Sequence, residues 1–247
     1  MDFRSKKVLI TGGSIGIGLE LAKQFIAEGS RVLICARNLP ALQKAKTANP
    51  SLEIVQCDVT DLHQVRALFA EAKKRLGGID ILINNAAVFR RFNLLNAYPV
   101  EKQLEEIDIN LKGPVQVTSI FLEELLQSDA PVIVNLTSGL GYVPMTAAPI
   151  YSATKAAINS WTQSLRHQLR ETNTKVVLLS PPVVATRMNE NNPGVEGMKM
   201  ISPQRFAELS VEGLKKGKNE ILVSPINSLK IISRIAPGMA FRVMNKQ

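Results

Sequence analysis

The stretch "VLITGGSIGIG", residues 8–18, places a glycine-rich turn between an apolar run and a helical pattern. Glycines allow a tight turn and close approach of the backbone to a ligand. The helix that follows offers free N–H groups and a positive dipole end. In this context the pattern predicts a dinucleotide pyrophosphate site, with an ordinary glycine-rich turn as the alternative. The residues expected at the site are Gly12, Ser14, Ile15, Gly16, Ile17 and Gly18.

Short β-rich runs alternate with helical patterns along the chain. The runs are "KKVLI", "RVLIC", "EIVQC", "IDILIN", "PVIVNLTS", "KVVLLS" and "EILVS", and the longest helical region spans about 101–127. Apolar strands alternating with helices indicate βαβ units and a parallel sheet with helices on both faces. Right-handed crossovers make this α/β arrangement a doubly wound sheet of the Rossmann type. No repeat or linker divides the 247 residues, so a single domain, 1–247, is predicted.

The composition narrows the function classes. Two cysteines, Cys35 and Cys57, form no disulfide framework and fit no metal-ligand spacing, so we expect buried core residues and no metal. The net charge of +9 is spread along the chain and accompanies no nucleic-acid motif, so no nucleic-acid partner is expected. The apolar runs are too short for a membrane span or a signal-peptide core, which predicts a cytoplasmic protein.

The end of the second expected strand bears on which dinucleotide binds. An NAD site usually carries an acidic residue there, to hold the ribose 2′-OH. This chain reads Cys35-Ala36-Arg37-Asn38, with no acid and one arginine. A guanidinium can hold a 2′-phosphate with two charge-assisted hydrogen bonds. Arg37 therefore predicts NADP(H) over NAD(H), with a solvated loop arginine as the alternative.

The stretch "YSATKAAINSW" places Tyr151 four residues before Lys155, so both share one helix face. A free phenol has a pKa of about 10. A nearby ammonium is expected to lower the pKa of Tyr151 and make it a usable acid and base. A second stripe on the same helix points nearly opposite. Its residues, Ala153, Ala157, Trp161, Leu165 and Leu169, indicate either a subunit interface or intrachain core.

Taken together, these motifs resemble those of the short-chain dehydrogenase/reductase family, compact single-domain type, from Lys7 to about Ser224. The glycine run, "NNAA" (84–87), "DINLKGP", "NLTSG" and Tyr-x-x-x-Lys follow the family's order. Within the family, "LTSGLGYVP", the Tyr151 helix and "SRIAP" are similar to reductases of bacterial lipoteichoic-acid D-alanylation gene clusters.

The resemblance implies specific roles. Tyr151 would handle the proton, Ser138 would orient the substrate oxygen, and Asn110 would order a proton-relay water beside Lys155. It also implies cofactor contacts from Asp58, Val59, Asn84, Ala86, Tyr151, Lys155, Pro181, Val184 and Thr186. Two positions depart from the family pattern, because Ala87 and Pro182 stand where glycines are usual; neither change removes a catalytic group.

Two further segments complete the expectations. Residues 187–203, with Met188, Met198 and Met200, lie where the family has a substrate lid; a surface loop is the alternative. Phe89, Val143 and Met145 are expected near the substrate. The extension 225–247 mixes apolar and basic residues, and Pro237-Gly238 interrupts any long helix. We therefore expect it to pack on its own domain or another subunit rather than on a membrane surface.

The expected function is hydride transfer between NADP(H) and a small-molecule carbonyl or secondary alcohol, in a homodimer or homotetramer. The alternative from another class is a regulatory protein that binds NADP(H) without turnover. Loss of one of the four catalytic residues would favour the sensor, and all four are present.

Overall fold

The computed structural model describes residues 1–189 and 199–245. They form a parallel seven-stranded sheet in the order β3-β2-β1-β4-β5-β6-β7. The strands are β1 (Lys7–Thr11), β2 (Arg31–Ala36), β3 (Leu52–Gln56), β4 (Ile81–Asn84), β5 (Val132–Leu136), β6 (Lys175–Ser180) and β7 (Glu220–Leu222). The strand order reverses between β1 and β4, where doubly wound sheets open a crevice for ligands. The predicted α/β fold is confirmed.

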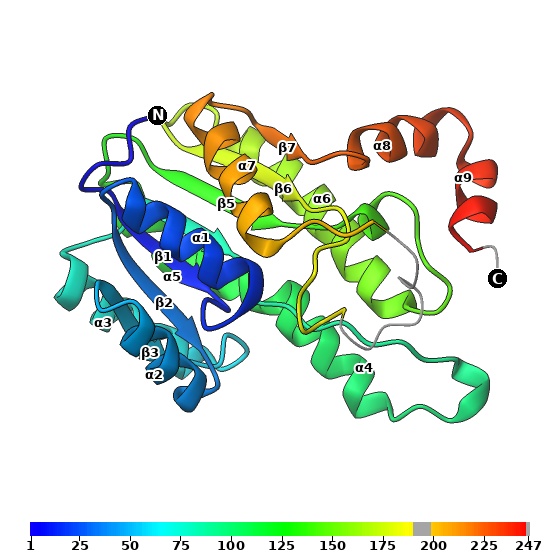
Figure 1. Cartoon of the computed structure of the whole chain (residues 1–247), viewed down its shortest axis with the longest axis horizontal. Helices are drawn as coiled ribbons and strands as arrows, with labels where there is room; N and C mark the ends of the chain where they lie inside the picture. The colour runs from blue at the N-terminus through cyan, green and yellow to red at the C-terminus, as the bar shows by residue number, and fades with distance from the viewer. Residues whose placement is uncertain (190–198, 246–247) are drawn as a thin grey trace.

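Helices cover both faces of this sheet (Figure 1). One face carries α1 (Gly16–Ala27), α2 (Leu39–Ala48) and α7 (Pro203–Lys215); the other carries α3 (Leu62–Leu76), α5 (Gly113–Leu125) and α6 (Pro149–Gln168). Along β1, Val8 and Ile10 pack in the core under α1, α2 and α7, and Leu9 packs in the core under α3, α5 and α6. Because successive strand side chains point to opposite faces, a strand buried on both sides is a continuous apolar run.

The helical region expected at 101–127 is interrupted by a π-helical turn. α4 (Val100–Ile107) leads into the π turn (Asp108–Lys112), and α5 follows directly; a short 3₁₀ turn (Leu94–Asn96) precedes α4. Asn110 stands at the centre of the π turn and is buried. Single π turns inside helices are rare and occur frequently at functional sites.

The C-terminal extension forms two helices beyond β7, at the end of the molecule away from β3 (Figure 1). They are α8 (Ile226–Ile235) and α9 (Pro237–Met244), with the break at the predicted proline. Asn245 fastens α9 to its own domain, since it accepts from Thr146 N at 2.7 Å and donates to Pro144 O at 3.0 Å. The described helices include none long and apolar enough to cross a membrane.

The apolar stripe of α6 divides between core and surface. Leu165 and Leu169 lie in the intrachain core, and Trp161 packs against it. Ala153 is exposed. The C-terminal half of the stripe therefore belongs to the domain's own core, as the alternative interpretation held. Cys35 and Cys57 are free and buried, as predicted.

Candidate active site

A cleft of about 340 Å³ runs along the carboxyl ends of the strands. The glycine loop after β1, the ends of β2 and β3, the segment after β4 and the start of α6 all contribute to it. The expected site residues that line it are Gly12, Ser14, Ile15, Gly16, Ile17, Gly18, Arg37, Asp58, Val59, Ala86, Tyr151, Lys155, Pro181 and Thr186. Tertiary folding thus gathers residues that are far apart in the sequence at one edge of the sheet.

The glycine loop brings backbone into close contact with the segment after β4. Gly12 has φ +66°, and a Cβ there would lie 2.8 Å from Ala86 Cα. At Gly18 a Cβ would lie 2.5 Å from the side-chain amide of Asn85. Both positions therefore require glycine, one for its conformation and both for space.

The N-terminus of α1 is open at this loop. Its N-cap residue, Ile15, makes no side-chain cap, and the first turn contains no acidic residue. In contrast, Asn38 caps α2 and Asp61 caps α3. The first N–H groups of a helix need acceptors, and their dipole end favours an anion. The cleft therefore offers an anion site of the kind that binds a pyrophosphate.

Asn84, the last residue of β4, and Asn85, the residue after it, differ in what they contact. Asn84 is 3% exposed and does not line the cleft; its amide donates to Thr118 Oγ1 and Asn135 Oδ1. Asn85 lines the cleft instead and donates to Thr11 O at 2.9 Å and Gly12 O at 3.0 Å. Of the two side chains, that of Asn85 therefore lines the cleft. Strand alternation is the reason, because one of two successive residues must face the interior. The cofactor contact expected of Asn84 stays a prediction.

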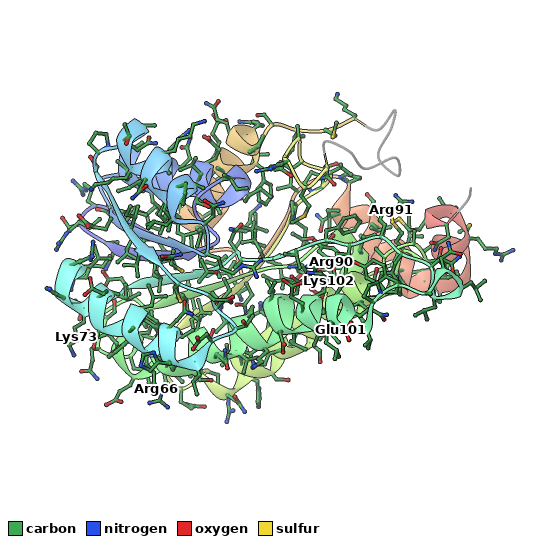
Figure 2. All side chains as sticks on the ribbon, turned by 90° about the horizontal axis from the view of Figure 1, so that it is seen from below. Arg66, Lys73, Arg90, Arg91, Glu101 and Lys102 are labelled. Carbon is green, nitrogen blue, oxygen red and sulfur yellow. The ribbon has the colours of Figure 1, made fainter. Side chains whose placement is uncertain are left out.

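Arg37 lies at the cleft where β2 ends, as predicted, but acidic groups surround it. Its Nη1 is 3.3 Å from Glu105 Oε1 and 3.8 Å from Asp58 Oδ2, and the side chain is 50% exposed. Glu105 also pairs with Arg90 at 2.6 Å and with Lys102 at 3.3 Å. Arg90 comes from the segment after β4 and Lys102 from α4, and the two are labelled next to each other in Figure 2. The structure therefore places a mixed ion-pair cluster, rather than a bare cation, at this end of the cleft.

Tyr151 and Lys155 are both buried on the first turns of α6, with exposures of 8% and 3%. Lys155 Nζ donates to Leu136 O at 3.1 Å and lies 5.5 Å from the centre of the Tyr151 ring. Ser138 lies two residues beyond the end of β5 and caps a 3₁₀ turn (Gly139–Gly141). The carboxyl end of β5 and the start of α6 thus hold these three side chains together.

The pKa shifts of this pair follow from burial. Burial raises the pKa of Tyr151 to about 12, against the effect of a hydrogen bond from Ser138. Burial lowers the pKa of Lys155 to about 8. The pKa of Tyr151 thus stands above its ordinary value rather than below it; burial is the largest cause, and the nearby Glu106 carboxyl acts in the same direction. The effect of the Lys155 ammonium on the phenol stays a prediction. At neutral pH the phenol carries its proton.

Asn110 faces the segment after β4 rather than the cleft surface. Its Oδ1 accepts from Val88 N and its Nδ2 donates to Val88 O, both at 2.8 Å. Nδ2 also lies 3.3 Å from Thr154 Oγ1. This asparagine thereby joins the π turn, the cleft segment and α6.

The remaining expected residues fall in three places. Val184 is 2% exposed and pairs with Ile201 in an isolated bridge, away from the cleft lining. Phe89 packs edge-on against Tyr151, with ring centres 4.9 Å apart, whereas Val143 is buried. Of the expected lid, Met188 lines the cleft, and residues 190–198 lie outside the described residues.

Sequence reasoning missed some residues that the structure places at the site. Asn85, Thr137 and Arg187 line the cleft, and Glu106 is a buried carboxyl group that acts electrostatically on Tyr151 and Lys155. For Asn85 the signal was present in the "NNAA" motif, one position along. For Glu106 the sequence offered none. Within the described part of the chain, no group of three metal-ligating side chains comes together.

Known proteins with similar sequences are short-chain dehydrogenases and oxidoreductases. Residues 6–196 match the family model for short chain dehydrogenases. The chain is 36% identical to "Uncharacterized oxidoreductase DltE" of Bacillus subtilis (strain 168), covering 100% of this chain and 99% of that protein. It is 33% identical to "Uncharacterized oxidoreductase SAR2567" of Staphylococcus aureus (strain MRSA252), with 90% and 97% covered.

Solved structures agree on the fold. A short chain dehydrogenase/reductase from Burkholderia phymatum, crystallised in complex with NAD, superposes with a TM-score of 0.86 at 22% identity, covering 97% of this chain and 96% of that one. A short-chain dehydrogenase from Novosphingobium aromaticivorans gives 0.83 at 22% identity, with 96% and 87% covered. Family model, relatives and fold agree, and the chain belongs to the short-chain dehydrogenase/reductase family of oxidoreductases.

Proposed function

We propose that this protein transfers a hydride between NADP(H) and a small-molecule carbonyl or secondary alcohol. The observation that carries the proposal is that Tyr151 and Lys155 line the same cleft as the glycine loop, with the Ser138 side chain in hydrogen-bond contact with Tyr151. A sensor that binds NADP(H) without turnover would need only the glycine loop. The buried tyrosine and lysine favour catalysis, because burying these groups costs folding free energy and titratable groups perturbed in this way cluster at functional sites.

The cleft fits a nicotinamide dinucleotide. The open N-terminus of α1 and the backbone cradle at Gly12 and Gly18 suit a pyrophosphate. Asp58 and Val59 would contact the adenine end, and Pro181 would lie with Tyr151 near the nicotinamide. Thr186 lines the cleft beside Gly16 of the glycine loop. When bound, the nicotinamide would supply or accept the hydride.

The chain's own residues account for the proton. In the reduction direction Tyr151 is a neutral phenol and donates its proton to the substrate oxygen as the hydride reaches the carbon. Ser138 donates a hydrogen bond to the same oxygen and holds it in place. Lys155, charged below a pH of about 8, stabilises the phenolate that Tyr151 becomes. In the oxidation direction the same groups act in reverse.

Arg37 supports NADP(H) over NAD(H). Among Cys35–Asn38, at the end of β2, Arg37 is the one cation, and none of the four residues is acidic. The neighbouring Glu105 and Asp58 carboxylates act against this preference, because they repel a phosphate. We therefore propose a preference that Arg37 sustains against its two acidic partners.

A first experiment titrates the purified protein with NADPH and NADH by fluorescence, then screens ketones and aldehydes for NADPH oxidation. We expect saturable binding, tighter for NADPH, and turnover of at least one carbonyl class. Tyr151→Phe should then lose at least about 10³-fold in turnover, because the phenol that lines the cleft is gone, with NADPH affinity nearly unchanged. Full activity of this variant would show that another group donates the proton. NADPH binding without any turnover would favour the sensor.

The homo-oligomeric state and the cytoplasmic location stay predictions. Size-exclusion chromatography with light scattering would measure the first directly.

A further inference from the structure

Glu106, on the last turn of α4, is a fully buried carboxyl group that the proposed mechanism does not use. Its Oε1 accepts a hydrogen bond from Arg90 N at 3.0 Å. Its Oε2 is buried and has no hydrogen-bond partner among the described residues. Burying a carboxyl group with one oxygen unpaired is costly, so a charge nearby is needed to balance it.

Glu106 and Asn110 lie four residues apart and hold the same segment. Asn110 binds both backbone polar atoms of Val88, and Glu106 binds the N–H of Arg90. The two side chains therefore fix alternate residues, as a neighbouring strand would do. Phe89, between them, is directed against Tyr151, where the rings meet at 84° with centres 4.9 Å apart. Glu106 thereby helps to build the wall beside the phenol.

Glu106 interacts electrostatically with titratable groups around it. α4 packs against α6, which carries Tyr151 and Lys155. The side chains of Arg90 and Lys155 act electrostatically on Glu106, and Glu106 in turn acts to raise the pKa of Tyr151. Burial raises the pKa of Glu106 to about 7, and both cations act to lower it. Burial lowers the pKa of Lys155 to about 8, and Glu106 acts to raise it. Each buried charge therefore depends on the other.

We propose that Glu106 is a positioning residue of the active site, whose carboxylate keeps Lys155 charged and whose backbone contact holds Phe89 against Tyr151. The proposal rests on the proposed function for its role in catalysis. Its electrostatic part can be measured without turnover, because it concerns the protonation of one lysine.

The test compares Glu106→Gln with the wild type and with Glu101→Gln. Glutamine keeps the size of the side chain and an oxygen that accepts from Arg90 N, so the change removes mainly the charge. Glu101 lies on the first turn of the same helix and is exposed, which makes the control the same chemical change without burial (Figure 2). Protein labelled with [¹³Cε]lysine is titrated by NMR, and Lys155→Met identifies the Lys155 resonance.

We expect the titration midpoint of Lys155 to fall by about one pH unit or more in Glu106→Gln and to stay unchanged in Glu101→Gln. Once a carbonyl substrate is known, the alkaline limb of kcat/KM should move down by the same amount, with NADPH affinity at pH 6.5 unchanged. A purely structural glutamate would leave the midpoint in place, and this outcome would overturn the proposal. Absence of turnover in the wild type would instead count against the proposed function.

Should Glu106→Gln fail to fold, the acidic partner can be observed directly. With [¹³Cδ]glutamate labelling, the Glu106 carboxyl should titrate well above the exposed glutamates. Lys155→Met should raise that midpoint further, because the ammonium that favours the carboxylate is gone. A Glu106 midpoint that Lys155→Met leaves unmoved would refute the pairing.

Discussion

Replacing Arg37 by alanine tests which dinucleotide the cleft was built for. The guanidinium lines the cleft at the end of β2 and is half exposed. A 2′-phosphate bound there would receive two charge-assisted hydrogen bonds, each at the low end of the usual range, about 1.5 kcal/mol, because water competes at this exposure. Arg37 must first leave the ion pair with Glu105, which costs about 0.5–1 kcal/mol.

The net contribution is about 2 kcal/mol, which corresponds to roughly a 30-fold increase in the Kd of NADPH for Arg37→Ala. This is a lower bound, because Glu105 and Asp58 would then face the phosphate without their cation. NADH lacks that phosphate, so its Kd should change less than about threefold. The difference between the two cofactors, rather than either Kd alone, carries the inference.

The assay is fluorescence titration of both cofactors at low and moderate salt. Lys102→Ala is the matched control, since Lys102 pairs with the same Glu105 at 3.3 Å but does not line the cleft. It should leave the NADPH preference in place. Equal weakening of NADPH and NADH by Arg37→Ala, or tighter NADH binding by the wild type, would refute the assignment of the 2′-phosphate to Arg37.

Two further predictions concern the cleft and the buried acid. Gly12→Ala should weaken NADPH binding more than tenfold and lower the Tm, because it combines a positive φ with a contact of 2.8 Å to Ala86; Gly77→Ala, at φ +75° with no neighbour within 4 Å, should cost only about 1–2 kcal/mol of strain and spare binding. Glu106 keeps its proton up to a pH of about 7 in the native state, whereas the unfolded chain releases it near 4.5. The contribution of Glu106 to stability is therefore present at low pH, and this part of the free energy of unfolding falls as the pH rises between those two values. Urea unfolding at pH 5 and pH 7.5 should therefore show wild type losing stability relative to Glu106→Gln; equal changes in both proteins would contradict the raised pKa.

Much of the fold could be predicted because its signals are local. Continuous apolar strands, helical spacing between them and glycines after the first strand indicate a doubly wound parallel sheet. Tyr151 and Lys155 share a helix face by spacing alone, and their motif order led to the family. The helical region 101–127 was predicted without its interruption, because the π turn around Asn110 has no signature in residue spacing.

The sequence by itself determined which residues end each strand, and a parallel sheet places all of those ends at one edge. That is why the glycine loop and Arg37 could be assigned to one edge of the sheet before any geometry was known, while the resemblance to the family added Asp58, Ser138 and Tyr151. Only the tertiary structure decided what surrounds each of them. In the folded chain Asn85 rather than Asn84 lines the cleft, and Glu105 forms an ion pair with Arg37. Glu106 is buried and acts electrostatically on Lys155. The tertiary structure also reversed the expected direction of the Tyr151 pKa shift, because desolvation depends on all the atoms packed around a group, and these come from distant parts of the chain.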